Sequence, residues 1–279
     1  MKVVNHLLEG VEVVRSPNVS GFMTPTGAIM HYTAGYTADS AIKTLCNPAA
    51  KVSAHLVIDT DGTITQLVPF NRIAWHAGPS KLAGRSGCNN FTIGFEFVNP
   101  GYFRIGKDGK TIMDWEGKSA VPAARLALYD LSVRAANKKI GGGTFIWPGY
   151  TDAQIEAGLA ALEAIKEAYG LTLIAGHEDV DTRQWKTDPG PAFPMGRFKA
   201  VINAASDDRS DGAKPAVSRF LVNVPKLNVR QSPRSDAMVL AVLSGGSEVV
   251  VIEDLGVWSL VEYAPGQQGY LSDQYLKKG

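Results

Sequence analysis

The stretch GAIMHYT, residues 27–33, is an apolar run that reaches His31 and is followed by Ala34-Gly35. A short apolar run bounded by turn-forming residues is typical of a buried strand. A second run, residues 172–175, leads through Gly176 into His177 in the same way. Sites in sheet proteins are commonly built where a strand gives way to a loop, because the strand fixes the side chain while the loop leaves it open. Both imidazoles are therefore candidate functional groups.

Strand-like and helical patterns are interleaved around these two runs. Strands are predicted over residues 54–59, 63–68 and 91–98, and helices over residues 39–46, 122–137, 151–169 and after Pro194. The helix over residues 151–169 is the clearest, with a Thr151-x-x-Gln154 capping box at its start and Gly170 at its end. Between two strands, Asp59-Thr-Asp-Gly62 is a hairpin turn signal. This mixture predicts an α/β fold with helices on the faces of a sheet.

Length and composition restrict the class of protein. A chain of 279 residues favours one large domain and one small one. With 28 Lys+Arg against 27 Asp+Glu there is no basic excess, which argues against a nucleic-acid partner. Cys46 and Cys88 are too few for a disulfide framework, and two free thiols are favoured over one disulfide.

No membrane span and no signal peptide are visible. No uninterrupted apolar stretch approaches about eighteen residues. Residues 1–10 contain Lys2, His6 and Glu9 and never build the apolar h-region of a leader. Synthesis in the cytoplasm is expected.

The chain divides at a polar stretch, AASDDRSDGAKPAVS, over residues 204–218. Such a stretch is typical of a linker, here between domains over residues 1–203 and 219–279. After it only strand-like runs appear, over residues 238–243, 248–253 and 258–263, with turns at Gly245-Gly246, Gly256 and Pro265-Gly266. That spacing predicts a small all-β barrel. Trp258 is expected to fill this barrel, since it falls within a strand run.

A carboxylate lies within reach of the second histidine in the sequence. Asp188 follows His177 by eleven residues, in the loop Lys186-Thr-Asp-Pro-Gly-Pro191, where two prolines stiffen the backbone. Two imidazoles, one carboxylate and a water form the three-plus-open ligand set of catalytic zinc. Spacing alone leaves other carboxylates open as competitors, namely Glu178, Asp179 and Asp181.

A series of strings resembles one known family. In chain order these are His31-Tyr-Thr-Ala-Gly35, Ser53-Ala-His55-Leu-Val-Ile-Asp59-x-Asp-Gly62, Ala74-Trp-His76-Ala-Gly78, Ile93-Gly-Phe-Glu96, Gly176-His-Glu-Asp-Val180 and Lys186-Thr-Asp-Pro-Gly-Pro191. Together they resemble the zinc N-acetylmuramoyl-L-alanine amidases, which include AmpD-type enzymes, phage amidases and peptidoglycan recognition proteins. The resemblance spans residues 27–200 and implies a mostly mixed sheet with helices packed around it.

The resemblance also implies roles for individual residues. The zinc (Zn2+) ligands would be His31, His177 and Asp188. Glu96 matches the catalytic acidic position and Lys186 the catalytic lysine, while His76 is expected to contact substrate. His55 remains open between a structural and a functional role.

The implied function is hydrolysis of the amide between N-acetylmuramic acid and L-alanine in bacterial peptidoglycan. The alternative is a recognition protein that binds muropeptide without cutting it, and the presence of Asp188, Glu96 and Lys186 favours catalysis. A zinc peptidase is a third reading, but no HExxH helix is present. An insertion over residues 100–150, with Trp115 and Gly141-Gly-Gly143, lies outside the family pattern and is expected to shape specificity.

Residues 219–277 resemble the bacterial SH3-like domain. The resemblance rests on Leu227-Asn-Val-Arg230, Ser232-Pro233, Gly256-Val-Trp258, Gly269-Tyr-Leu271 and Tyr275-Leu276. It implies binding to the cell wall, which raises the local concentration of a tethered enzyme at an insoluble substrate; the alternative is a barrel that only packs on the catalytic domain. A phage endolysin, a bacterial remodelling enzyme and an injected toxin all fit, each acting on the wall after release or delivery. The sequence does not indicate the oligomeric state.

Overall fold

A computed structural model of the chain describes residues 1–141, 143–204, 219–231, 233–254, 258–264 and 267–278. The chain forms two compact units, one of Met1–Val3 with Leu7–Asp208 and the other of Val4–His6 with Arg209–Gly279. Most of the predicted linker over residues 204–218 lies outside the described residues, as do the predicted turns at Gly256 and Pro265-Gly266.

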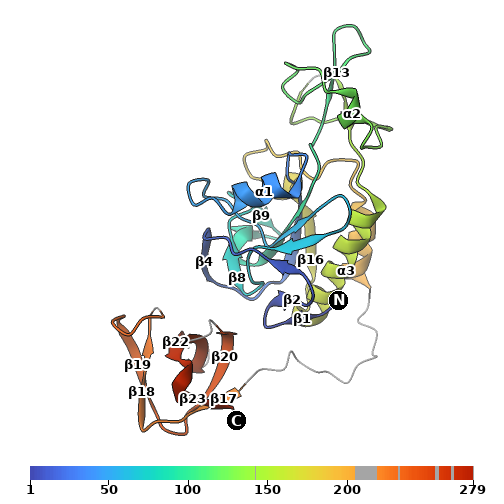
Figure 1. The fold of residues 1–279 in the computed structure, drawn as a ribbon. Helices are drawn as coiled ribbons and strands as arrows, with labels where there is room; N and C mark the ends of the chain where they lie inside the picture. The colour runs from blue at the N-terminus through green and yellow to red at the C-terminus, as the bar shows by residue number, and fades with distance from the viewer. Residues whose placement is uncertain (142, 205–218, 232, 255–257, 265–266, 279) are drawn as a thin grey trace. The chain divides into compact units, whose positions relative to one another are not determined.

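The core of the larger unit is a six-stranded sheet in the order β16-β5-β11-β6-β7-β3 (Figure 1). Its strands are β3 (Glu12–Val13), β5 (Gly27–Tyr32), β6 (Leu56–Ile58), β7 (Ile64–Gln66), β11 (Thr92–Phe97) and β16 (Leu173–Gly176). Strands β16, β5, β11 and β6 are parallel, whereas β7 is antiparallel to β6 and parallel to β3. The sheet is therefore mixed, and every strand predicted for this region is confirmed.

The predicted hairpin turn joins β6 to β7. Asp59 N donates to Thr63 O at 2.9 Å, and Gly62 N donates to Asp59 O at 3.0 Å. Gly62 has a φ of +87°, which glycine adopts without strain. A Cβ there would also lie 2.8 Å from Ala153 O, so glycine is required at this point on both grounds.

One face of the sheet is apolar and is covered by α3 (Asp152–Tyr169) and α5 (Met195–Asn203). Figure 1 shows α3 alongside the sheet near β16. The capping box at the start of α3 is confirmed, because Thr151 Oγ1 accepts from Gln154 N at 3.1 Å and Gln154 Oε1 accepts from Thr151 N at 3.3 Å. The helix ends at Gly170, whose φ is +70°. The cluster beneath includes Met30, Phe95, Phe97, Ile155, Leu162, Ile165, Phe198 and Ile202.

The opposite face of the same strands carries polar side chains. Side chains alternate along a strand, so His31 points away from the face that buries Met30, and Glu96 away from the face that buries Phe95. Helix α1 (Ala38–Leu45), which the sequence predicted, covers part of this face, where Leu45 packs in a cluster with Val57, Leu67 and Val98. A third cluster consists of Ile29, Ala77, Cys88, Phe91, Ala175 and Val180. Both cysteines are free, as predicted.

Short elements complete the periphery of the larger unit. They are β1 (Val3–Val4), β2 (Leu7–Leu8), β4 (Val19–Phe22), β8 (Arg72–Ala74), β9 (Lys81–Leu82), β10 (Arg85–Ser86), the 3-10 turn Cys88–Asn90 and α4 (His177–Val180). None of the helices in the part of the chain that the structure describes is long and apolar enough to cross a bilayer.

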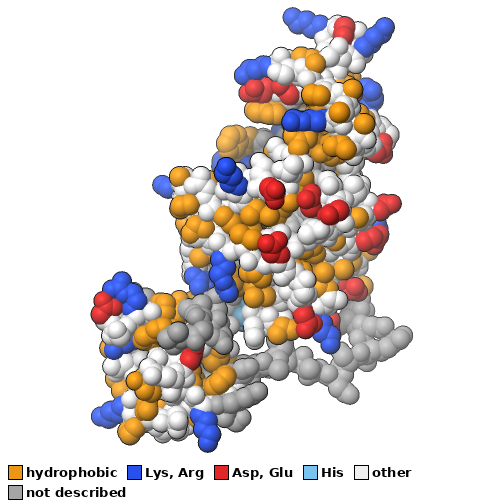
Figure 2. Space-filling view, viewed as in Figure 1, with side chains coloured by type: hydrophobic (Ala, Val, Ile, Leu, Met, Phe, Trp, Pro, Cys, Tyr) orange, Lys and Arg blue, Asp and Glu red, His pale blue; other side chains and the backbone are white. Residues whose placement is uncertain are grey.

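The insertion forms a lobe that stands away from the sheet, where Figure 1 labels β13 and α2. Its elements are β12 (Arg104–Ile105), β13 (Ile112–Met113), α2 (Ala123–Leu126), β14 (Val133–Ala136) and β15 (Thr144–Trp147). Phe103, Val121 and Ile146 form its own small core, against which Tyr36 of the main body packs. Figure 2 shows both hydrophobic and basic side chains on the surface of this lobe.

The helix predicted over residues 122–137 is wrong. Only α2 is helical, and residues 133–136 form β14, which pairs antiparallel with β15. Between α2 and β14 the chain turns at Asp130, whose carboxylate accepts from Ser132 N and from Ser132 Oγ, both at 2.9 Å. This Asx-type turn competes with the helix for backbone N–H donors. The backbone hydrogen-bonding groups of residues 133–136 then pair with β15.

The smaller unit is all-β, as predicted. One antiparallel sheet has the order β19-β18-β22-β21-β20-β17-β23. The strands are β17 (Arg219–Val222), β18 (Lys226–Arg230), β19 (Val239–Ser244), β20 (Glu248–Asp254), β21 (Trp258–Ala264), β22 (Gln267–Ser272) and β23 (Leu276–Lys278), with a 3-10 turn at Asp273–Tyr275. The sheet encloses one core, to which Val222, Val229, Val249, Val261 and Leu271 contribute. The predicted turn at Gly245-Gly246 is confirmed, with Gly246 at a φ of +82°.

The expected position of Trp258 is wrong. Its side chain is only half-buried and lies outside the core cluster of the smaller unit. Instead it lines a surface groove together with Lys226, Arg230 and Tyr275. Side chains alternate along β21, and the core residue Val261 shares a face with Ser259, so Trp258 projects from the opposite face.

Candidate active site

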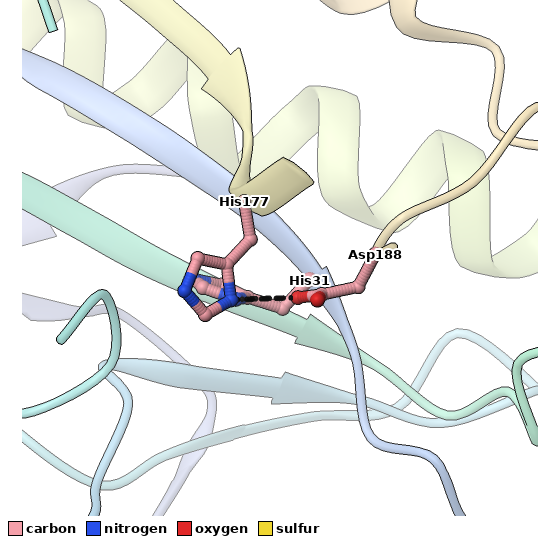
Figure 3. A group of neighbouring side chains, drawn as sticks. All are labelled: His31, His177 and Asp188. Carbon is pink, nitrogen blue, oxygen red and sulfur yellow. Dashed lines mark hydrogen bonds and ion pairs between the residues drawn. The ribbon is translucent and has the colours of Figure 1, made fainter. Parts of the chain in front are cut away.

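The three predicted metal ligands meet at one point on the polar face of the sheet. His31 lies near the end of β5, His177 begins α4 directly after β16, and Asp188 lies in the loop before α5. Figure 3 shows the side chains of His177 and Asp188 pointing toward each other, with His31 beside them. His31 Nδ1 lies 3.0 Å from His177 Nδ1, and Asp188 Oδ2 lies 2.9 Å from each of these nitrogens. All three side chains are buried.

Strand pairing and one close backbone approach bring these residues together. Gly176 pairs with Met30 in the parallel register of β16 and β5. The residues that follow them in the sequence, His177 and His31, are two of the predicted ligands. The loop that carries Asp188 folds back against α4, where Glu178 N donates to Asp188 O at 2.8 Å. A Cβ on Gly176 would lie 2.7 Å from Pro189 Cδ, so the glycine lets this loop come close.

The outer nitrogens of the imidazoles determine where each ring carries its proton. His177 Nε2 lies 3.2 Å from Ala77 O, and His76 Nε2 lies 3.1 Å from Thr92 O. A carbonyl oxygen can only accept, so each of these nitrogens carries the proton in the neutral ring and Nδ1 keeps a lone pair. His76 Nδ1 lies 3.0 Å from His31 Nε2, which must then donate. His31 and His177 therefore each present an Nδ1 lone pair to the shared centre.

This arrangement fits a metal ion. Two lone pairs and a carboxylate oxygen converge within 3.0 Å with no proton between them when the rings are neutral. A cation at the centre would turn this mutual repulsion into attraction. Two imidazole nitrogens and one carboxylate oxygen are a donor set used by catalytic zinc, and the second hydrogen bond of each ring is the support that metal-bound histidines require. Across the described ranges, no other group of three or more such side chains could hold a metal.

The surroundings favour the deprotonated forms of His31 and Asp188. Burial lowers the pKa of His31 to about 4, and the neighbouring His177 lowers it in the same direction. Burial alone would raise the pKa of Asp188, but the interactions with His177 and His31 outweigh it and hold that pKa below its usual range. Neutral imidazoles and an ionised carboxylate are the forms that bind a metal.

His76 is a partner of His31 rather than part of an open surface. Both of its ring nitrogens are engaged, by His31 Nε2 and by Thr92 O, and the residue is buried. Its ring lies over Gly94, where a Cβ would stand 2.6 Å from His76 Cγ. The contact between His76 and substrate stays a prediction. A glycine inside a strand pattern indicates a close approach, and Gly94 is a sequence signal that could have indicated this packing.

His55 has a structural role. Its Nε2 donates to Arg72 O at 2.9 Å, and its Nδ1 accepts from Gly94 N at 3.0 Å. Burial lowers its pKa to about 4, so the ring is neutral and both hydrogen bonds are satisfied. It fastens β11 to the start of β8 and is not among the three residues that converge at the predicted metal site.

Glu96 lies next to the metal ligands with an unused oxygen. It pairs with His31 in the parallel register of β11 and β5, so both side chains project from the same face. Among the described residues, Glu96 Oε2 is buried and has no hydrogen-bond partner. Burial first, and the charge of Asp188 second, raise the pKa of Glu96 well above its usual range, while Lys186 acts to lower it. Such a group is suited to exchange protons with a bound water or substrate.

Sequence comparison places the chain in a family. The family described as N-acetylmuramoyl-L-alanine amidase matches residues 21–191, which hold all three predicted metal ligands and Glu96. The chain belongs to this family. A second family, described as bacterial SH3 domain, matches residues 225–277 of the smaller unit.

Two relatives of the amidase family illustrate the range of the match. The chain is 32% identical over 158 residues to the 1,6-anhydro-N-acetylmuramyl-L-alanine amidase AmpD of Enterobacter cloacae. The matched region covers 56% of this chain and 60% of the relative. The chain is 32% identical over 155 residues to the protein of the same name from Escherichia coli strain K12, covering 55% and 60%. The match thus spans 60% of the length of these relatives.

The fold is also that of a solved amidase. A crystal structure of a Se-Met AmpD derivative superposes with a TM-score of 0.51 at 24% identity, covering 72% of this chain and 99% of that chain. At this identity the likeness concerns the fold, and it confirms the mixed sheet flanked by helices.

The loop that carries Lys186 is held by a buried aspartate. Asp181 is fully buried, and its Oδ1 accepts from Arg183 Nε at 2.8 Å. Its Oδ2 accepts from the backbone N–H groups of Trp185 at 3.1 Å and of Lys186 at 3.3 Å. The charge of Lys186 acts on the pKa of both His31 and Glu96, so its ammonium group lies near the predicted site.

The competing carboxylates are directed elsewhere. Asp179 Oδ2 accepts from Gly176 N at 3.1 Å at the start of α4, and Asp181 holds the loop described above. Glu178 Oε2 accepts from Asn137 Nδ2 at 3.4 Å. Of Asp188 and these three competitors, the fold therefore brings only Asp188 to the two histidines.

Proposed function

We propose that this chain is a zinc-dependent N-acetylmuramoyl-L-alanine amidase, which hydrolyses the amide between N-acetylmuramic acid and the L-alanine of the peptidoglycan stem peptide. The observation that carries the proposal is the convergence of two Nδ1 lone pairs and the Asp188 carboxylate, within a chain of this family. The relatives named above are 1,6-anhydro-N-acetylmuramyl-L-alanine amidases by name, which supports an amidase reaction on a muramyl peptide. Glu96 Oε2, which has no partner among the described residues, supports catalysis over recognition alone.

Each residue has a proposed role in the reaction. His31, His177 and Asp188 hold zinc, which when bound lowers the pKa of a coordinated water and polarises the scissile carbonyl. Glu96 takes a proton from the attacking water and returns it to the leaving amine. Lys186 donates to the oxyanion that develops on the carbonyl oxygen, with its loop fixed by Asp181.

The test is mass spectrometry of purified peptidoglycan after incubation with the protein. Free stem peptides beginning at L-alanine are expected from the zinc-loaded protein and not after chelation. Glu96→Ala is expected to reduce their rate of release by about 10²–10⁴-fold, the usual contribution of a general acid or base. Glu163→Ala, on the exposed side of α3, is the matched control and should act like the unchanged protein.

A second outcome would favour recognition without cleavage. If intact glycan-linked peptides remained in every tube while the protein sedimented with the wall, hydrolysis of this substrate would be rejected. The same incubation with soluble muropeptides then separates a preference for soluble fragments from a recognition protein.

We further propose that the smaller unit binds the cell wall through the groove lined by Trp258. A half-buried tryptophan beside the exposed Tyr275 and two cations, Lys226 and Arg230, offers an aromatic platform with polar partners. In the full chain, Trp258→Ala is expected to lower the fraction sedimenting with purified wall about tenfold. Met238→Ala, exposed but outside the groove, is the control. Equal sedimentation of the two variants would contradict this role.

A further inference from the structure

The insertion and the Asp188 loop form a single cavity of about 430 Å³. Asp188, Lys186 and Trp185 line it from the loop, and Arg104, Trp115 and Lys139 line it from the insertion. A volume of this size suits a small ligand or part of a larger one. The insertion therefore builds a wall of the cavity that leads to the predicted metal ligand, which the sequence alone could not show.

Two tryptophans on this cavity are unusually exposed. Trp115 is 57% exposed and Trp185 is 63% exposed. They come from different segments, one from the insertion and one from the loop that Asp181 holds. Large aromatic side chains left in solvent beside a cavity are typical of surfaces that bind a ligand.

Arg104 is held in place from several sides. Its Nε donates to Trp115 O at 2.7 Å, its guanidinium lies 5.1 Å from the centre of the Phe145 ring, and a Cβ on Gly117 would lie 3.1 Å from its Cδ. The guanidinium has further N–H donors beyond Nε, and within the described residues no carboxylate forms an ion pair with them. A fixed guanidinium with free donors is preorganised for a carboxylate.

The charge of the cavity is positive. Arg104, Lys139 and Lys186 contribute three cations, while its one carboxylate, Asp188, is engaged by His31 and His177. Lys139 already donates to Glu178 O, and Lys186 has a proposed role in catalysis. Arg104 is therefore the cation that remains for binding an anionic part of the substrate.

We propose that Arg104 is a specificity-determining residue that binds a free carboxylate of the stem peptide while the scissile amide lies at the His31, His177 and Asp188 centre. The proposal rests on the amidase function proposed above. It assigns the insertion to substrate selection: peptides with a free terminal carboxylate are bound in preference to peptides in which that group is amidated or cross-linked.

The experiment compares two soluble N-acetylmuramyl tripeptides that differ only in a free or an amidated C-terminal carboxyl group. With the zinc-loaded full chain, kcat/KM is expected to be about 10- to 100-fold higher for the free acid, the usual strength of a hydrogen bond to a charged group. Arg104→Gln is expected to abolish this preference, and Arg104→Lys to retain part of it. Arg134→Gln, an exposed arginine on β14 of the same insertion, should keep the full preference.

The two proposals fail in different ways. Release of product from both peptides at equal rates by the unchanged protein, or a preference that survives Arg104→Gln, would overturn the role of Arg104 and leave the amidase standing. Absence of product from both peptides and from purified peptidoglycan would reject the amidase. In that case calorimetric binding of the same two peptides decides the role of Arg104: tighter binding of the free acid, lost in Arg104→Gln, supports it, and equal affinities reject it.

Discussion

One face of the six-stranded sheet is covered by α3 and α5, whereas the opposite face carries His31 and Glu96. The residues just before these two, Met30 and Phe95, lie on the covered face of the same two strands. On the covered face, Phe97 is fully buried among the rings of Tyr150, Phe193 and Phe198. Here stability comes from apolar area and close packing, which depend on volume.

On the polar face, individual atoms matter more than volume. His76 Nε2 and His177 Nε2 each donate to a backbone carbonyl, and His31 Nε2 donates to His76 Nδ1. A small displacement there leaves volume unchanged but removes a hydrogen bond. The comparison teaches that one strand can contribute to the stability of the fold and to its chemistry independently, provided the two sets of side chains alternate.

The largest expected effect comes from removing a ligand on the polar face. Asp188→Ala should lower zinc affinity more than about 100-fold, because loss of a supporting partner alone costs 10- to 100-fold. Amidase activity should fall more than about a thousandfold, since the metal contributes several kcal/mol to the transition state. Metal analysis after dialysis and the peptide-release assay measure the two effects.

Asp179→Asn is the control for that change, because Asp179 caps α4 without reaching the histidines. Stoichiometric zinc in Asp188→Ala would show that the three convergent atoms are not the metal site.

A smaller effect is expected from the apolar face. Phe97→Ala should lower the free energy of unfolding by about 3–5 kcal/mol, the usual range for a buried phenylalanine. Chemical denaturation measures it. Below the unfolding transition the variant should keep its zinc, because Phe97 lies on the side away from the ligands. Loss of zinc from the folded variant would mean that the two faces are coupled.

The smallest effect is expected from Gly94→Ala, which tests the support that His76 gives to His31 on the polar face. Gly94→Ala would place a Cβ 2.6 Å from His76 Cγ and so displace the ring that accepts from His31. Zinc affinity should fall about 10- to 100-fold, as for other supporting partners of metal ligands, and competition with a fluorescent chelator measures it.

Gly196→Ala is the matched control, since nothing lies within 4 Å of the added methyl in α5. It should leave zinc affinity unchanged and stabilise the helix by about 0.5–1 kcal/mol. Equal zinc affinity in the two alanine variants would remove His76 from the support of the site.

Local signals made much of the fold predictable. The capping box at Thr151, the glycine at position 170 and the turn at Asp59 each specify a backbone geometry through a few neighbouring residues. The prediction of a helix over residues 122–137 was wrong for two reasons. Asp130 forms a local turn, and β15 pairs with residues 133–136 from a later part of the chain. Short strands such as β3 and β8 carry too few residues for a periodic pattern.

The candidate site divides in the same way. The positions of His31, His177 and Asp188 followed from the family resemblance, and the structure brings them together. The surroundings did not follow, because the contacts of His76, the anchoring of the loop by Asp181 and the place of Arg104 on the cavity join segments far apart in the chain. Trp258 was misplaced for a related reason: its strand was predicted, but which face of that strand meets the core depends on the other strands.

The carbonyl groups that orient the imidazoles have a consequence for how this protein tolerates change. The acceptors for His177 and His76 are Ala77 O and Thr92 O, and every amino acid that could replace Ala77 or Thr92 brings the same carbonyl oxygen. Substitution at these two positions is therefore limited by the space available to a new side chain and not by loss of the acceptor. The tautomers of the metal ligands are in this sense shielded from mutation at the sites that determine them.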